Sequence, residues 1–172
     1  MPDPILIRPA TTADAPALLA IYRPYVETSA VSFETVVPTA AEFAARIEKA
    51  LNGWHWLVAE HAGGCVGYAY GSAHRERAAY RYSVEVSAYV DTGHHRRGIG
   101  RALYLQLFDA LAAKGYCHAY AGITLPNDAS VALHRGVGFE PVGVFKSVGR
   151  KFGRWHDVAW FQRRLRDAPI AE

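Results

Sequence analysis

Residues 84–103 read Val-Glu-Val-Ser-Ala-Tyr-Val-Asp-Thr-Gly-His-His-Arg-Arg-Gly-Ile-Gly-Arg-Ala-Leu and carry the clearest structural signal in the chain. A β-branched and aromatic strand ends near Val90, a basic loop with glycines follows, and the helical spacing of apolar residues begins at Gly100. The first N–H groups of a helix are unpaired and lie at the positive end of its dipole, so they attract phosphate. Gly98 and Gly100 place no side chain in the way of an anion, and arginines on both sides of them add positive charge. The stretch therefore predicts a strand, a phosphate-binding loop and a helix.

Strand and helix patterns alternate on both sides of this stretch. Short β-branched or aromatic runs predict strands at 4–9, 54–60, 65–71, 82–90, 117–124, 141–148 and 155–165, the last two joined by a turn at 149–153. Apolar residues at helical spacing predict helices at 39–51, 100–114 and 126–138, and a first helix that begins after Thr12 or Asp14 and precedes a loop at 28–35. This order predicts an α/β fold with a mixed sheet that contains at least one parallel crossover pair.

Composition narrows the class of protein. The 172 residues are 51% hydrophobic and carry a net charge of +3, which excludes intrinsic disorder and predicts one domain over residues 1–172, with its core at about 4–165. Cys65 and Cys117 lack the spacing of a metal site or a redox motif, so we expect reduced thiols and no metal. The first residues do not form a signal peptide, and no apolar run is long enough to span a bilayer. We therefore expect a soluble, cytoplasmic protein with no membrane partner.

Two blocks of the sequence resemble a known family. Residues 95–100 look like the acetyl-CoA pyrophosphate loop of the GNAT N-acetyltransferase superfamily, Gln/Arg-x-x-Gly-x-Gly/Ala, with His95 in place of Gln or Arg. Residues 126–140 resemble that superfamily's Asn-x-x-Ser/Ala…Tyr-x-x-x-Gly-Phe helix, with His134 at the Tyr position. The resemblance implies the GNAT fold, a mixed sheet of about six to seven strands flanked by about four helices.

The resemblance is most detailed for one branch of this superfamily. Phosphinothricin and methionine sulfoximine N-acetyltransferases also carry His at position 134, the strand at 84–90 and the block Gly-x-Lys-Phe/His-Gly-x-Trp-x-Asp, which falls on 149–157 here. This implies acetyl-CoA as the cosubstrate, a homodimer, and transfer of acetyl to the α-amine of a small amino-acid analogue such as phosphinothricin or methionine sulfoximine. The residues expected to contact acetyl-CoA are Ala88, Tyr89, Val90, Arg96, Arg97, Gly98, Ile99, Gly100, Arg101, Asn127 and Ser130.

Glu85 is the candidate general base. It lies in the middle of an apolar strand, where a carboxylate is costly unless it is paired or functional, and burial would raise its pKa toward that of a base near neutral pH. A solvent-facing position or an ion pair with Arg81 is the alternative that the residues alone leave open. The resemblance favours catalysis, because related enzymes place their base at this Glu. It also makes His134 the candidate general acid for the leaving thiolate, although a lone helix His is more often structural.

Arginines before the Glu85 strand suggest an acidic acceptor. Arg75 and Arg77 suit carboxylate, phosphinate or sulfoximine groups through bidentate hydrogen bonds, whereas a solvated loop is the plainer interpretation. Phe33 and Glu34 lie in the loop between the first two helices and are expected to form the opposite wall. The residues expected to bind the acceptor are Phe33, Glu34, Arg75, Arg77, Glu85, Val86 and Ser87. The predicted reaction is direct attack by the amine, without an acyl-enzyme.

Other functions fit parts of the sequence. The same fold could acetylate another amino acid, a polyamine, an aminoglycoside or a protein N-terminus, although an arginine-rich rim disfavours cationic acceptors. A non-catalytic acyl-CoA-binding regulator is a further alternative, against which the retained Glu85 argues. Residues 146–166 hold seven Lys or Arg and one acid, a balance that also suits nucleic-acid binding. Because 158–162 alternates like a half-buried strand, we expect a sheet strand there and no nucleic-acid partner.

Overall fold

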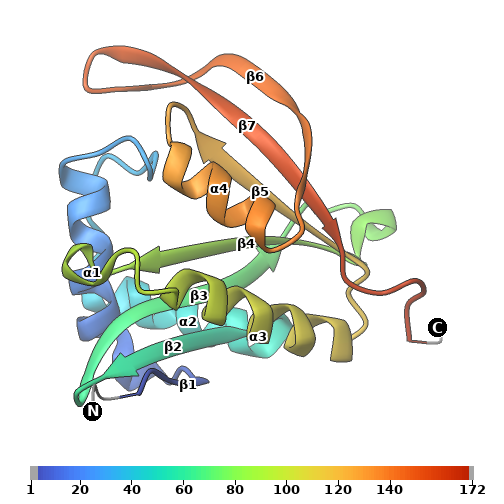
Figure 1. The fold of residues 1–172 in the computed structure, drawn as a ribbon, viewed down its shortest axis with the longest axis horizontal. Coiled ribbons are helices and arrows are strands. Elements are labelled where there is room, and N and C mark those ends of the chain that lie inside the picture. The colour runs from blue at the N-terminus through green and yellow to red at the C-terminus, as the bar shows by residue number, and fades with distance from the viewer. Residues whose placement is uncertain (1–3, 171–172) are drawn as a thin grey trace.

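The computed structural model describes residues 4–170 and contains a mixed sheet with helices packed on both faces (Figure 1). Within the described residues the sheet has seven strands in the order β1-β2-β3-β4-β5-β7-β6. The strands are β1 (Leu6–Pro9), β2 (Trp56–His61), β3 (Gly64–Ala73), β4 (Ser83–Val90), β5 (His118–Thr124), β6 (Glu140–Lys151) and β7 (Arg154–Arg164). The helices are α1 (Ala15–Glu27), α2 (Ala40–Gly53), α3 (Ile99–Ala113) and α4 (Asp128–Gly136). The predicted α/β architecture is therefore confirmed.

Local signals explain where the helices begin and end. Thr39 caps α2, because its hydroxyl accepts the Glu42 N–H at 3.2 Å while the Glu42 carboxylate accepts the Thr39 N–H at 2.7 Å. Asn127 caps α4 by accepting the Ser130 N–H at 3.1 Å. After α3, Gly115 adopts a φ of 98°, a left-handed conformation that ends the helix. Among residues 4–170, no helix is long and apolar enough to cross a membrane.

The predicted parallel pair is β4 with β5, and it separates after a short stretch of pairing. The described register runs from Ser83 opposite His118 to Glu85 opposite Tyr120. Both strands then continue, β4 to Val90 and β5 to Thr124, without further pairing between them in the described residues. This side of β4 therefore presents backbone N–H and C=O groups after Glu85 that no strand satisfies.

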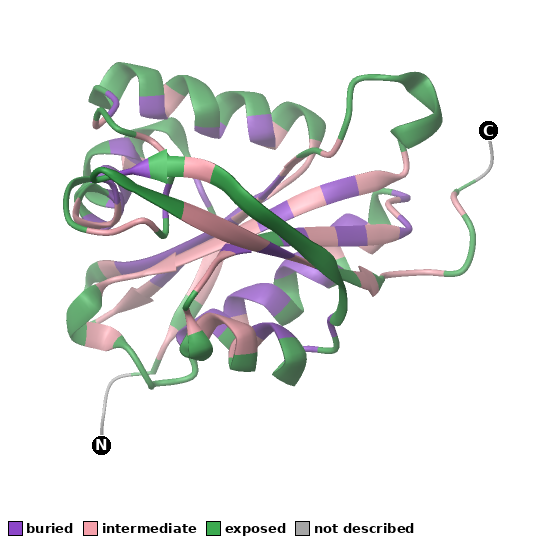
Figure 2. Ribbon diagram, turned by 90° about the horizontal axis from the view of Figure 1, so that it is seen from above, coloured by how far each residue is buried: buried purple, intermediate pink, exposed green. Residues whose placement is uncertain are grey.

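One face of the sheet is covered by α3, whose leucines and the rings of Tyr104 and Phe108 are buried against it. Val84 and Val86 point to this face and are buried in one cluster with Leu103, Leu107 and Leu111. Side chains at alternate strand positions point to opposite faces, so these two valines leave the residue between them for the other side. Figure 2 shows the buried segments of the helices turned toward the sheet and the exposed segments turned away from it.

The other face of the sheet packs against α1 and α2 and is rich in aromatic rings. Trp56 and Tyr68 are nearly fully buried and stack with their ring centroids 5.3 Å apart. Phe43 of α2 meets both of these rings edge-on, and Tyr22 of α1 meets Tyr89 of β4 in the same way. This face therefore packs aromatic rings directly on the strands, whereas the α3 face combines leucines with the rings of Tyr104 and Phe108.

The last hairpin differs from its predicted form. A turn was expected at 149–153, but β6 continues through Lys151 and turns at Phe152 and Gly153, whose φ values are 51° and 71°. Two successive left-handed residues make the tight turn that suits a twisted hairpin. The extra residues of β6 are taken up by a register shift between Phe145 and Gly149, so the glycine at 149 does not form the turn.

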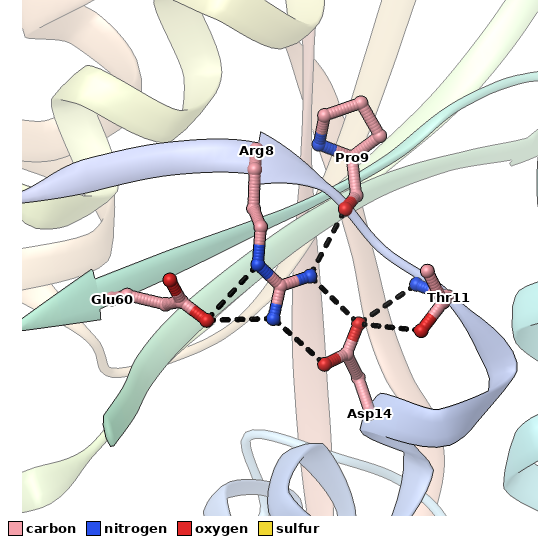
Figure 3. Close-up of polar contacts among 5 residues, drawn as sticks. All are labelled: Arg8, Pro9, Thr11, Asp14 and Glu60. Carbon is pink, nitrogen blue, oxygen red and sulfur yellow. Dashed lines mark hydrogen bonds and ion pairs between the residues drawn. The ribbon is translucent and has the colours of Figure 1, made fainter. Parts of the chain in front are cut away.

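Arg8 fastens the first strand to its surroundings (Figure 3). Its guanidinium donates to both carboxylate oxygens of Asp14, at 2.8 and 2.9 Å, and to Glu60 Oε1 on β2, at 2.7 and 3.0 Å. The hydrogen bonds from Arg8 hold the pKa of Asp14 below its usual value. This network joins β1, β2 and the start of α1. The charges of Arg8, Asp14 and Glu60 therefore stabilise the fold and are already paired with one another.

Candidate active site

The loop between β4 and α3 has the backbone geometry of an anion site. Arg96 and Gly98 adopt left-handed φ values of 62° and 75°, and Gly98 is the residue that caps α3. Left-handed residues alternating with ordinary ones turn successive N–H groups toward a common point. The first α3 residues, Ile99 to Arg101, precede the hydrogen bond from Ala102 N–H to Gly98 O, so their N–H groups lack helical partners. The predicted loop therefore supplies backbone donors for a phosphate.

The two glycines of this loop have different roles. A Cβ on Gly98 would meet no atom within 4 Å, so its left-handed φ explains the glycine. A Cβ on Gly100 would lie 3.0 Å from Leu133 Cδ2, which shows that Gly100 lets α4 approach α3 closely. Arg101 donates to Gly136 O at 2.7 Å and also joins the two helices. Gly100 and Arg101 thus have packing roles that the sequence did not reveal, while Arg96 stays exposed to solvent.

The end of β4 is held by groups from α1. Tyr25 donates its hydroxyl to Val90 O at 2.5 Å, and His95 Nε2 lies 2.9 Å from the same hydroxyl. His95, the residue that departs from the family pattern, therefore turns back onto the strand. Ala88 packs on the α3 side, whereas Tyr89 packs among the rings of the α1–α2 side. The predicted cofactor residues of β4 thus flank the open edge of the strand.

His134 lies inside the protein, between α3 and α4. It is 5% exposed, its Nδ1–H donates to Ser130 O at 2.7 Å, and its Nε2 accepts from the Tyr104 hydroxyl at 3.0 Å. Burial lowers the pKa of His134, so the neutral ring is favoured near neutral pH. Both ring nitrogens already have partners, an arrangement that suits a structural role in positioning α4. The side chain of the predicted Asn127 likewise caps this helix.

Glu85 is the centre of a polar cluster on the α1–α2 side of the sheet. Its side chain is 29% exposed, and its Oε1 accepts from His74 Nδ1 at 3.1 Å and lies 3.5 Å from Arg75 Nη1. Burial raises the pKa of Glu85, although the hydrogen bond and charge of His74 offset part of this rise. The described partners of Glu85 are therefore His74 and Arg75.

His74 is a residue of this cluster that sequence reasoning missed. Its ring stacks on Tyr120 of β5, with centroids 4.5 Å apart and an interplanar angle of 15°. This stacking fixes the ring plane and aims Nδ1 at Glu85. The signal in the sequence is slight: His74 directly precedes Arg75 and opens the basic segment 74–81.

Three other predicted acceptor residues, on β4 and on the loop before it, do not share one place. Ser87 shares the face of Glu85 and lies opposite Tyr70 in the register of β3 and β4. Val86 points to the opposite face and is buried against α3, so only its backbone could reach a ligand. Arg77 is exposed at the start of the short 3₁₀ turn Ala78–Tyr80, and no contact to Glu85 is described for it.

Phe33 and Glu34 lie in the α1–α2 loop and are held from two sides. Glu34 accepts from Arg46 Nη2 and from the Tyr22 hydroxyl, both at 2.5 Å, and these bonds lower its pKa despite its burial. Phe33 covers Gly149 of β6, where a Cβ would collide with its ring. Lys151, 5% exposed, donates to Ser32 O at 2.7 Å. The loop is therefore fastened to the C-terminal hairpin.

The fold, the phosphate loop and the half-buried carboxylate together define a class of acyl-transfer protein. Residues 7–160 match the family model described as "Acetyltransferase (GNAT) domain". The chain therefore belongs to the GNAT acetyltransferase family, as the sequence resemblance implied.

Similar proteins of this family are known by sequence and by structure. The chain is 41% identical over 160 residues to a phosphinothricin N-acetyltransferase of Streptomyces viridochromogenes, covering 93% of this chain and 87% of that protein. It is 40% identical over 168 residues to an L-methionine sulfoximine/L-methionine sulfone acetyltransferase of Pseudomonas aeruginosa, covering 95% and 98%. A crystal structure of a Sinorhizobium meliloti phosphinothricin acetyltransferase in complex with AcCoA superposes with a TM-score of 0.89 at 39% identity, covering 94% and 88%.

Proposed function

We propose that the protein transfers the acetyl group of acetyl-CoA to the α-amine of a small amino-acid analogue, such as phosphinothricin or methionine sulfoximine. One observation carries this proposal: Glu85 is half-buried, bonded to His74, and lies where β4 and β5 separate, on the strand that leads into the phosphate loop. The names of the relatives described above support the acceptor class. A cytoplasmic location would fit such an acceptor.

The residues around the open edge of β4 fit acetyl-CoA. When bound, acetyl-CoA supplies an acetyl thioester that an amine can attack. The N–H groups at the start of α3 and the exposed guanidinium groups of Arg96 and Arg97 would hold its diphosphate. The edge of β4 from Ala88 to Val90, which β5 leaves unpaired, would hold the amide-containing arm, as an added strand would.

Glu85 would prepare the amine for attack. An α-amine is protonated at neutral pH and has no free lone pair until it loses that proton. A carboxylate with a raised pKa accepts the proton more readily than an ordinary one. Direct attack without an acyl-enzyme is favoured because Cys117 is buried before β5 and Cys65 lies at the far end of β3. His134, with both nitrogens bonded, would position α4 and would not donate a proton.

The charge of the site favours an acceptor with an acidic group. Arg75 is about half exposed beside Glu85, and Arg77 follows it on the same loop. Guanidinium groups in this position attract a carboxylate and repel a polyamine or an aminoglycoside.

A thiol-release assay tests this proposal. The purified protein with acetyl-CoA is offered phosphinothricin, methionine sulfoximine, methionine sulfone and common amino acids, with spermidine as the cationic comparison. We expect release of CoA with at least one of the amino-acid analogues and none with spermidine. Release with none of the amines would support the acyl-CoA-binding regulator instead, and release with spermidine alone would overturn the acceptor class.

We also infer that the protein acts as a homodimer and does not bind nucleic acid. The edge strand β6 exposes apolar side chains, among them Val142, Phe145 and Val148, which a second copy would cover. In the basic segment 146–166, Lys146 pairs with Asp157, and Lys151 and Arg163 donate inward to backbone carbonyls. Sedimentation equilibrium would give the oligomeric state, and a shift assay with random DNA at physiological salt would test for nucleic-acid binding.

A further inference from the structure

The outer hairpin of the sheet, β6 and β7, reaches the loop that joins α1 and α2, where Lys151 meets Ser32 across 119 positions of the chain (Figure 1). Gly149 and Lys151 are two positions apart on β6, so they point to the same face of the strand. A register shift between Phe145 and Gly149 precedes them. Such a shift re-aims the residues that follow it, and both positions here face the loop.

Gly149 is the point at which the ring of Phe33 rests on the hairpin. A Cβ on Gly149 would overlap three atoms of that ring, Cε2, Cζ and Cδ2. His156 is the cross-strand partner of Gly149, and the centroid of its ring lies 6.2 Å from that of Phe33. Because residue 149 has no side chain, the Phe33 ring can occupy this place.

Lys151 holds the backbone of the same loop. It is 5% exposed, and its ammonium donates to Ser32 O at 2.7 Å. The Glu34 N–H donates to Ser32 Oγ at 3.1 Å, and the Tyr22 hydroxyl donates to the Glu34 carboxylate at 2.5 Å. Because the Tyr22 hydroxyl has a single proton, Ser32 Oγ donates its own proton to the Tyr22 oxygen, 2.6 Å away. These bonds fix the loop from Ser32 to Glu34.

Tyr22 connects this loop to the side of the sheet that carries Glu85. Its ring meets the ring of Tyr89 on β4 edge-on, with centroids 5.0 Å apart. Tyr22 and Ser72 of β3 both line a cavity of about 300 Å³, and Ser72 is the cross-strand partner of Glu85. Directly opposed residues on antiparallel strands share a face, so the loop and the candidate base border the same face of the sheet.

The geometry points to Gly149 and Lys151 as positioning residues of the acceptor site: they hold the α1–α2 loop from the hairpin and thereby set the KM for the amine. This inference rests on the proposed function, because it takes the loop at 28–35 as one wall of the acceptor site. The described contacts of both residues go to this loop and to the hairpin itself. The chemical step and the binding of acetyl-CoA should therefore not depend on them.

Removing the ammonium tests the contact from Lys151. Lys151→Met keeps an apolar stem of similar length but leaves Ser32 O without its donor. KM is measured by thiol release with methionine sulfoximine and with phosphinothricin. We expect KM to rise roughly tenfold, toward the lower end for a hydrogen bond to a charged group, while kcat and the Kd for acetyl-CoA stay within about twofold. Arg150→Met, the matched control, removes an exposed positive charge from the preceding residue and should keep the wild-type KM.

Adding a side chain tests the contact from Gly149. Gly149→Ala should displace the Phe33 ring and raise KM about fivefold, the effect of a modest steric conflict. Gly143→Ala is the matched control on the same strand, because a Cβ there meets no atom within 4 Å. In a Phe33→Ala background, Gly149→Ala should change KM by less than about twofold, since no ring remains to be displaced. This loss of effect distinguishes contact with Phe33 from general damage to the hairpin.

The kinetic constants separate this inference from the proposed function. If the wild-type protein releases no CoA with any amino-acid analogue, the proposed function itself fails. If it does release CoA, a wild-type KM in both folded variants would overturn the inference. A loss that falls on kcat, or a full effect of Gly149→Ala without the Phe33 ring, would also overturn it. Should Lys151→Met not fold, as judged by circular dichroism, Gly149→Ala with and without Phe33 still decides.

Discussion

The two faces of the central sheet show what the same strands can do with alternate residues. On the α3 face, Leu103, Leu107 and Leu111 are fully buried against small and branched strand residues. On the α1–α2 face, the strand residues between them carry Glu85 and aromatic hydroxyl groups beside a cavity. Neighbouring side chains of β4 point in opposite directions. Val84 and Val86 therefore pack into the core on the α3 face, whereas Glu85, the proposed base, lies on the α1–α2 face.

The two faces also handle polarity differently. The leucines of the α3 face need no partners beyond close contact, and the buried Tyr104 hydroxyl on that side is paired with His134. The α1–α2 face holds two carboxylates that would be costly to bury alone, and both are paired: Glu85 with His74, and Glu34 with Arg46 and Tyr22. Substitutions on the α3 face should therefore change stability, whereas substitutions around Glu85 should change rate or its dependence on pH.

Replacing the candidate base should give the largest effect on activity. Glu85→Gln keeps the shape of the side chain but cannot accept the proton, so kcat should fall by about 10²–10⁴ at neutral pH. The affinity for acetyl-CoA should change little, since Glu85 is not among the residues proposed to bind it. Steady-state kinetics and calorimetric titration with acetyl-CoA measure the two quantities.

Glu140→Gln serves as the matched control for this prediction, because Glu140 is an exposed residue at the start of β6. It should retain the wild-type kcat. A near-wild-type rate in Glu85→Gln would remove Glu85 from the role of base.

Truncating a buried side chain on the α3 face should lower stability and leave activity nearly unchanged. Leu107→Ala removes a side chain that is 0% exposed, so the free energy of unfolding should drop by about 2–5 kcal/mol. The kcat of the folded fraction should stay within about twofold, because this residue does not reach the α1–α2 face. Urea denaturation followed by tryptophan fluorescence measures the stability.

Leu105→Ala is the control on the same helix, since Leu105 is 37% exposed and should cost far less. If Leu107→Ala lowered kcat as strongly as Glu85→Gln while remaining folded, the division between a stabilising face and a chemical face would not hold.

The sequence predicts features that depend on neighbouring residues, but not features that depend on contacts between residues far apart in the chain. The glycine-containing basic loop and the helix starts at Thr39 and Asn127 are local patterns, so their residues could be predicted directly from the chain, whereas the strands that form the parallel pair could not be named. The end of β6 could not, because glycines at 149 and 153 look alike in sequence. Contact with Phe33, distant in the chain, decides that Gly149 is not the turn.

Residue roles that depend on contacts across the fold were also hidden. Gly100 belongs to the loop pattern, yet Leu133 explains why it lacks a side chain. His134 matches a family position, yet Tyr104 and Ser130 hold both of its nitrogens. Helical and strand periodicity reports which face a residue occupies, but it does not report what lies across from it.

The smallest predicted effect separates positioning from catalysis within the site. His74→Phe should keep the stacking on Tyr120 but remove the hydrogen bond to Glu85. That bond stabilises the charged carboxylate and lowers its pKa, so its loss should raise the Glu85 pKa further above the ordinary value. The base is active when ionised, and the acid limb of the kcat/KM profile should therefore move to higher pH. On that limb the rate should fall on the order of tenfold, with less change at the alkaline plateau.

A merely structural role for His74 would lower kcat/KM equally at every pH, so the position of the limb is the decisive readout. His74→Asn restores an N–H donor near the place of Nδ1 and should return the limb part of the way toward the wild-type pH. His118→Phe, a matched change on β5 with no described bond to Glu85, should leave the profile in place. If the acid limb of the kcat/KM profile stayed at the wild-type pH in His74→Phe, the limb would not report the ionisation of Glu85. The role of general base would then belong to a different side chain.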